Sequence, residues 1–158
     1  MVISVKAKKL VKNLAIPLVV GGVTGFLTKN DVAEFMATAQ KPVFMPPGWL
    51  FPVVWTILYA LMGIAAYIVD TSPKADNTKA FVFYYAQLFF NFIWSFIFFS
   101  SGNFLLAFLW ILILLALIII TTVKFYKIEP KAAYLMIPYI IWVAFATVLN
   151  FSIYILNM

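Results

Sequence analysis

One uninterrupted apolar segment, residues 80–123, reads AFVFYYAQLFFNFIWSFIFFSSGNFLLAFLWILILLALIIITTV and contains no Asp, Glu, Lys or Arg. As a single straight helix it would be about twice as long as the hydrocarbon core of a bilayer, which is roughly 30 Å thick. Its one polar turn is Ser100-Ser101-Gly102-Asn103, a combination that favours a chain reversal. The segment therefore predicts two membrane-spanning helices, over 80–99 and 104–123, joined by a tight hairpin.

The remaining sequence contains three more segments of this kind. Apolar runs predict membrane-spanning helices over residues 10–28, 49–69 and 132–156, each near the roughly 20 residues that a span requires. The chain of 158 residues is 66% hydrophobic and only 10% charged, whereas soluble domains carry about 25% charged residues. We therefore expect an all-α integral membrane protein, a five-transmembrane-helix bundle that forms a single domain over 1–158.

The lysines predict the orientation of this bundle. All but two of the 11 basic residues lie in the N-terminal segment up to residue 12 or after the second and fourth spans: Lys6, Lys8, Lys9, Lys12, Lys74, Lys79, Lys124, Lys127 and Lys131. Cytoplasmic segments of membrane proteins carry such an excess of positive charge. We expect the N-terminus in the cytoplasm and the C-terminus outside, in the cell membrane of a bacterium. The net charge of +6 then reflects topology and anionic lipid, and nucleic acid is excluded as a partner.

Two missing residue types restrict the chemistry. The chain has no cysteine and no histidine, which removes disulfides, thiolates, the commonest metal ligand and the commonest general base. All acidic residues fall in the predicted loops, and no base is present to activate a serine. We expect no metal site, no required cofactor and no conventional catalytic set.

The longest connection is the outer loop over 29–48. Asp31 and Glu34 have the spacing of a capping box, which predicts a short amphipathic helix after them. This helix either lies on the lipid headgroups or forms a lid over a cavity between the spans. Pro46 and Pro47 then predict a stiff, extended entry into the next span.

Polar side chains recur every four residues in the span over 80–99, at Gln87, Asn91 and Ser95. This spacing places them on one helix face, beside Trp94. Because an unpaired amide is costly in hydrocarbon, the face must point into the bundle. There it either joins helices by hydrogen bonds or lines a binding site.

Aromatic residues form similar stripes in two other spans. Trp55 and Tyr59 share a face of the span over 49–69, and Trp142 and Ala146, with Thr147 adjacent, lie on the span over 132–156. The deep tryptophans are further inside than an interfacial belt requires. They either pack as core or form the walls of a pocket for a flat, apolar ligand.

Three segments of the chain resemble the TspO/MBR family of translocator proteins and tryptophan-rich sensory proteins. They are KPVFMPPGW (41–49) with VWTILYALMG (54–63), QLFFNFIWS (87–95), and PYIIWVAFATVLN (138–150). Their order and spacing cover nearly all of residues 30–157. The resemblance implies a five-helix bundle, usually dimeric, with a pocket closed by the loop between the first two helices.

Members of the family bind porphyrins, sterols and benzodiazepine-type ligands. The matching positions imply a pocket lined by Trp55, Asn91, Trp94, Trp142, Ala146 and Thr147, to which the stripes add Tyr59 and Gln87. The lid would contain Phe35, Met36, Phe44, Pro46 and Pro47. This chain has Phe35-Met36 where the family often has Trp-Tyr, and Phe44 where it often has Trp. No basic residue follows Tyr154, so the usual sterol motif is absent.

The sequence thus favours a membrane receptor or sensor that binds porphyrins and related flat, apolar ligands, embedded in the bilayer as a homodimer. Two alternatives stay open. One is photo-oxidative breakdown of porphyrin, for which Trp55 and Trp142 are the candidate oxidisable indoles. The other is a small transporter of apolar cargo such as porphyrin or sterol.

Overall fold

The computed structural model describes residues 2–158 and consists of five long helices. Their bounds are α1 Val2–Thr38, α2 Leu50–Asp70, α3 Thr78–Ser95, α4 Phe104–Ile128 and α5 Pro130–Leu156, with a π-helical turn at Phe96–Ser100 between α3 and α4. All five helices are long and apolar enough to cross a membrane. The described residues contain no strand, so the expected all-α, five-span fold is confirmed.

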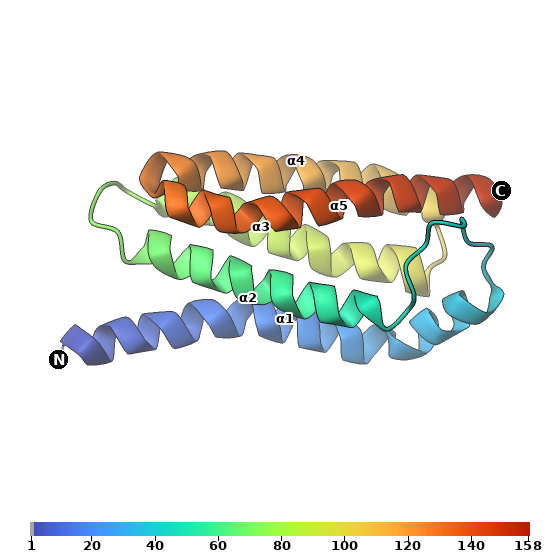
Figure 1. Cartoon of the computed structure of the whole chain (residues 1–158), viewed down its shortest axis with the longest axis horizontal. Coiled ribbons are helices and arrows are strands. Elements are labelled where there is room, and N and C mark those ends of the chain that lie inside the picture. The colour runs from blue at the N-terminus through green and yellow to red at the C-terminus, as the bar shows by residue number, and fades with distance from the viewer. Residues whose placement is uncertain (1) are drawn as a thin grey trace.

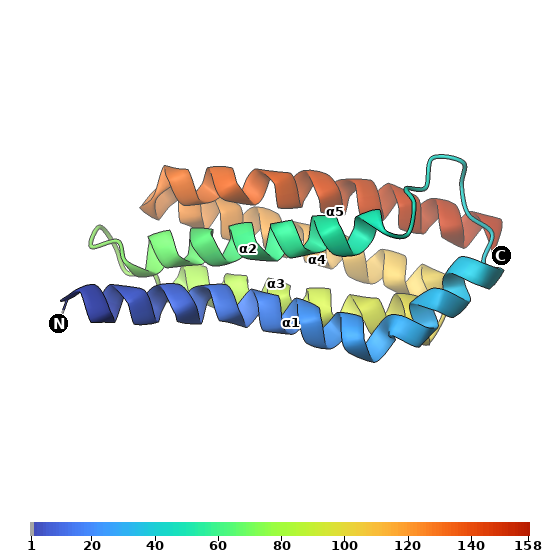
Figure 2. The same ribbon diagram turned by 60° about the horizontal axis from the view of Figure 1, so that its bottom comes forward.

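The helices run side by side, and the two termini lie at opposite ends of the bundle (Figure 1). Around the bundle, α1 packs against α2, α2 against α5, α5 against α4 and α4 against α3, which returns to α1. The last turns of α1 bend across the end of the bundle where the C-terminus lies (Figure 2). This end therefore has a helical cover that the opposite end lacks.

The chain reverses between α3 and α4 at the predicted position. The amide of Ser101 donates to the carbonyl of Phe96 over 2.9 Å, which closes the π-helical turn. Gly102 follows with φ of 62°, a conformation that costs glycine little. The Asn103 side chain then accepts a hydrogen bond of 3.0 Å from the amide of Leu106 and caps α4.

The first helix differs from the expectation of a span over 10–28 followed by an outer loop over 29–48. Instead α1 begins at Val2 and continues through Thr38, so only the segment after it, up to α2, is a loop. Lysine and alanine before residue 10 are good helix formers, and no Gly or Pro interrupts residues 29–38. The lysines mark where the apolar, membrane-spanning part of α1 ends, but the helix itself continues beyond them.

The lysine-rich end of the bundle is held by two acidic residues. The ammonium of Lys9 lies 3.3 Å from the Asp70 carboxylate. This carboxylate also accepts a hydrogen bond of 2.9 Å from the side-chain amide of Asn13. At the other side, Lys74 lies 2.9 Å from Glu129. The hydrogen bond from Lys74, and then that from Ser72, lowers the pKa of Glu129. These contacts join α1 to α2 and the α2–α3 loop to the start of α5.

A glycine on α2 lets α1 approach closely. A Cβ added at Gly63 would lie 2.8 Å from both the carbonyl oxygen of Asn13 and the Cα of Leu14. Both are backbone atoms of α1, so they cannot move aside as a side chain can. By contrast, a Cβ at Gly22 would meet nothing within 4 Å.

We expect Gly63→Ala to lower the free energy of unfolding by about 1–3 kcal/mol, because the methyl group forces α1 and α2 apart. Thermal unfolding of the purified protein in detergent measures this. Gly22→Ala, on α1, is the matched control and should leave the melting temperature unchanged or slightly raised. Equal melting temperatures for the two variants would contradict the close contact.

Candidate functional site

A cavity of about 620 Å³ lies between α1, α2, α3 and α5, in the half of the bundle that α1 covers. This volume falls within the roughly 300–1,000 Å³ typical of small-molecule sites. Its walls are mostly apolar and aromatic side chains, with glycines on α1. The predicted site residues among its lining are Trp55, Tyr59, Asn91, Trp94, Trp142 and Ala146.

Residue spacing explains why these side chains converge. The first turns of α2 present Trp55 and Tyr59 four residues apart, and α5 presents Trp142 and Ala146 in the same way. Residues four apart lie one above the other on a helix. Since α2 packs against α5, the two aromatic faces meet in one wall.

The rings of this wall support one another. The Trp55 indole lies 5.5 Å from the Tyr59 ring and, edge to face, 6.1 Å from that of Tyr139. Phe51 meets Trp142 edge to face at 5.8 Å. Such pairs stabilise by about 0.5–1.5 kcal/mol beyond their burial. The wall is therefore a rigid, apolar surface of aromatic rings that support one another.

Beneath the cavity, four polar side chains form a continuous hydrogen-bonded chain. The Tyr59 hydroxyl donates a hydrogen bond of 2.8 Å to the side-chain oxygen of Asn91. The Asn91 amide in turn donates a hydrogen bond of 2.7 Å to the Tyr139 hydroxyl. The Tyr139 hydroxyl donates a hydrogen bond of 2.8 Å to the side-chain oxygen of Gln87. The Gln87 amide donates to the sulfur of Met62, 3.6 Å away. The chain joins α2, α3 and α5, and we name it the polar chain.

A second hydrogen-bonded pair closes the other side of the cavity. The Trp94 indole N–H donates 3.1 Å to the oxygen of Asn150. The Asn150 amide donates 2.9 Å to the backbone carbonyl of Phe104. Trp94 thus presents its ring to the cavity while its one donor is already bound.

Trp142 differs from the other polar groups of the lining. Within the described part of the chain, its indole Nε1 and the Tyr84 hydroxyl are the buried side-chain polar atoms without a hydrogen-bond partner. Trp142 lines the cavity and Tyr84 does not. A buried donor without a partner costs about 1–3 kcal/mol. The indole N–H therefore has no acceptor within the described part of the protein.

Two predicted site residues do not line the cavity. Gln87 is fully buried as the inner end of the polar chain. Thr147 is half-buried, and its hydroxyl donates 2.8 Å to the carbonyl of Val143 in its own helix. Gln87 shares a helix face with Asn91 but lies one turn deeper, below the floor of the cavity.

The predicted lid residues separate into two groups. Phe35 and Met36 belong to α1 and line the cavity. Phe35 is buried, with its ring centroid 5.1 Å from that of Phe98 and 5.5 Å from that of Phe99. Phe44 is half-exposed and packs its ring on Phe145 at 6.4 Å. Pro46 and Pro47 lie in the loop but outside the lining, where Met45 and Gly48 stand instead.

The loop after α1 is fastened at its start. The backbone amide of Gln40 donates a hydrogen bond to the side-chain oxygen of Asn157. The side-chain amide of Asn157 donates back to the backbone carbonyl of Gln40, and both bonds are 2.9 Å long. Lys41 donates to the carbonyls of Met36 and Ala39, each over 2.8 Å. Asp31 accepts 2.5 Å from Ser100. These bonds tie the end of α1 to α5 and to the α3–α4 turn.

Several lining residues are not among the site residues predicted from the sequence. They include the glycines of α1, Met45, Phe98 and Phe99 of the π-helical turn, and Asn150. Gly21 admits the Tyr59 ring, because a Cβ there would lie 2.4 Å from Tyr59 Cε2. Asn150 continues the stripe of Trp142 and Ala146 at the same spacing, so periodicity alone was a usable signal for it.

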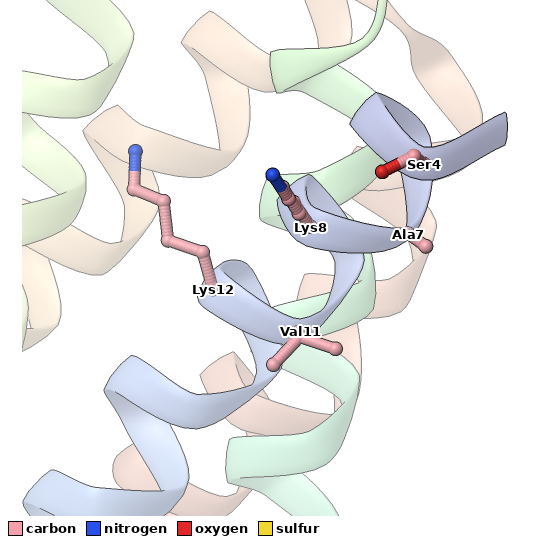
Figure 3. Close-up of a pocket in the computed structure, with 5 residues that line it drawn as sticks. All are labelled: Ser4, Ala7, Lys8, Val11 and Lys12. Carbon is pink, nitrogen blue, oxygen red and sulfur yellow. The ribbon is translucent and has the colours of Figure 1, made fainter. Parts of the chain in front are cut away.

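A second hollow, of about 420 Å³, lies near the N-terminus of α1. Its lining residues Ser4, Ala7, Lys8, Val11 and Lys12 all come from this one helix (Figure 3). With no second helix to form an opposite wall, it is a shallow surface of the helix. The cavity under α1 is therefore the candidate site.

We expect Tyr139→Phe to lower the free energy of unfolding by about 1–2 kcal/mol, because it leaves the Asn91 amide and the Gln87 oxygen buried without partners. Unfolding in detergent, followed by circular dichroism, measures the loss. Tyr134→Phe is the control on the same helix, since Tyr134 is exposed. A Tyr139→Phe protein as stable as the control would show that the polar chain contributes nothing.

Comparison with known proteins agrees with this geometry. The model of the TspO/MBR family matches residues 13–156. A tryptophan-rich protein TspO from Archaeoglobus fulgidus is 38% identical over 94% of this chain and 97% of its own length. A tryptophan-rich sensory protein from Cereibacter sphaeroides is 37% identical, over 85% and 82% respectively.

A human protein supplies a similar match. The human translocator protein is 36% identical over 77% of this chain and 73% of its own length. The residues that the family model matches include the helices that form the cavity. With its five spans, the chain is an integral membrane protein and belongs to the TspO/MBR family.

Proposed function

We propose that the protein is a membrane receptor that binds porphyrins and related flat, apolar ligands in the cavity under α1. The observation that carries the proposal is the aromatic wall of Trp55, Tyr59 and Trp142 around one buried donor without a partner, Trp142 Nε1. Flat rings stack on such a wall. The names of two relatives, a sensory protein and a translocator protein, agree with a role in ligand recognition.

The polar groups of the cavity favour a ligand of low polarity. Tyr59 and Trp94 each use their one hydrogen-bonding hydrogen within the protein, and the Asn91 amide donates to Tyr139. A very polar molecule would lose its bonds to water without replacing them. A macrocycle that is apolar over its faces and has a few acceptors at its edge fits this distribution, with one acceptor meeting Trp142.

Metal-free protoporphyrin is the suitable probe, because the chain has no His or Cys to ligate iron. We expect Trp142→Phe to weaken its binding roughly three- to tenfold, since the ring remains and the indole N–H is lost. Titration followed by the fluorescence of the porphyrin measures the Kd. Trp49→Phe, which changes an exposed indole outside the lining, should bind as the unchanged protein does. An unaltered Kd for Trp142→Phe would move the ligand elsewhere.

We further propose that the lysine-rich end faces the cytoplasm. The N-terminus of α1, the α2–α3 loop and the α4–α5 turn lie together at one end of the bundle (Figure 1). They carry most of the basic residues, and positive charge is retained on the cytoplasmic side.

The expected homodimer stays a prediction.

Because the chain has no cysteine, single cysteines report on orientation. We expect Val43→Cys, in the exposed loop after α1, to react with a membrane-impermeant maleimide in intact bacteria that express the protein. Ala75→Cys, exposed in the α2–α3 loop, should react only after the cells are broken. The opposite pattern would reverse the proposed orientation.

A further inference from the structure

The lining of the cavity contains a single charged side chain. Of the described residues that line it, Lys29 alone carries a charge. It follows the apolar part of α1, two residues before Asp31, which accepts a hydrogen bond from Ser100 at the α3–α4 turn, and it is exposed. An ammonium at this level stays hydrated while its stem lies along apolar surface, so its charge costs little.

Among the described residues, the ammonium of Lys29 has no acidic partner within ion-pair distance. The ion pairs of the described residues are Lys9 with Asp70 and Lys74 with Glu129, both at the opposite end of the bundle. The nearby acid on α1, Asp31, accepts a hydrogen bond from Ser100. The Lys29 ammonium lies over the face of the Phe26 ring, 4.6 Å from its centroid. Its charge is therefore free to meet an anion.

Open space connects this ammonium to the cavity. Gly25 lies four residues before Lys29 and hence on the same helix face. A Cβ at Gly25 or at Gly22 would meet no atom within 4 Å, and both glycines line the cavity. A molecule whose body lies against the aromatic wall can thus extend along α1 to Lys29 without displacing a side chain.

We propose that Lys29 selects ligands that carry a carboxylate at one edge, by binding that carboxylate where the cavity opens. This inference rests on the proposed function and names the class of ligand: a flat, apolar molecule with an anionic edge. The other unpaired donors of the lining, Trp142 Nε1 and the Ser95 hydroxyl, are neutral and take an uncharged acceptor equally well. Lys29 is therefore the residue that distinguishes an acid from its ester.

The test compares protoporphyrin with its dimethyl ester, in which the same ring carries no charge. Both are titrated against the protein in nanodiscs of zwitterionic phosphatidylcholine, where no anionic lipid competes. We expect the unchanged protein to bind the acid more tightly than the ester. Lys29→Gln should weaken binding of the acid roughly three- to tenfold and leave binding of the ester unchanged.

Two further variants separate the local charge from the overall charge. Lys29→Arg should keep the preference for the acid, because it keeps the charge at this position. Lys12 is an exposed lysine at the other end of the same helix. Lys12→Gln also removes one positive charge, and this variant should keep the preference for the acid. If Lys29→Gln retains the preference, or weakens the acid and the ester alike, the role of Lys29 is wrong while porphyrin binding stands. If neither porphyrin binds the unchanged protein, the proposed function itself fails.

Discussion

Polar side chains within a bilayer must find their hydrogen-bond partners inside the protein, because lipid tails offer none. In this protein that constraint joins Tyr59, Asn91, Tyr139 and Gln87 into the polar chain, which spans α2, α3 and α5. Each side chain satisfies a neighbour from another helix. The chain therefore sets how these three helices lie relative to one another, and with them the floor of the cavity.

The cavity exists because side chains are missing on one helix. On the side of α1, glycines stand where larger residues would fill the space, and Gly21 accommodates the Tyr59 ring. The opposite walls are rigid aromatic rings that hold one another in place. The fourth helix contributes no lining residue; it supports α3 from behind, where Trp110 donates 2.9 Å to the Phe90 carbonyl and stacks on its ring.

Particular residues show how far the sequence leads. The hairpin at 100–103 was predictable because a charge-free run of that length cannot cross a bilayer once. The extent of α1 was not, since Lys29 ends the apolar run without ending the helix. The polar face of α3 was also predictable, yet Asn91 reaches the cavity and Gln87 is buried below it. The spacing of residues along the sequence shows which helix face they share. Whether a residue on that face reaches the cavity depends on the neighbouring helices that pack against it.

By itself the sequence determined the solvent of this protein, its five spans, the asymmetric distribution of its lysines, and the helix faces that must point inward. These follow from the cost of charge and of unpaired amides in hydrocarbon, which acts on each segment separately. Only the tertiary structure decided which inward groups remain available. Trp94 is bound by Asn150, 56 residues away in the sequence, while Trp142 Nε1 has no partner. Whether a buried donor is satisfied depends on a neighbour from another helix, and local sequence does not specify that neighbour.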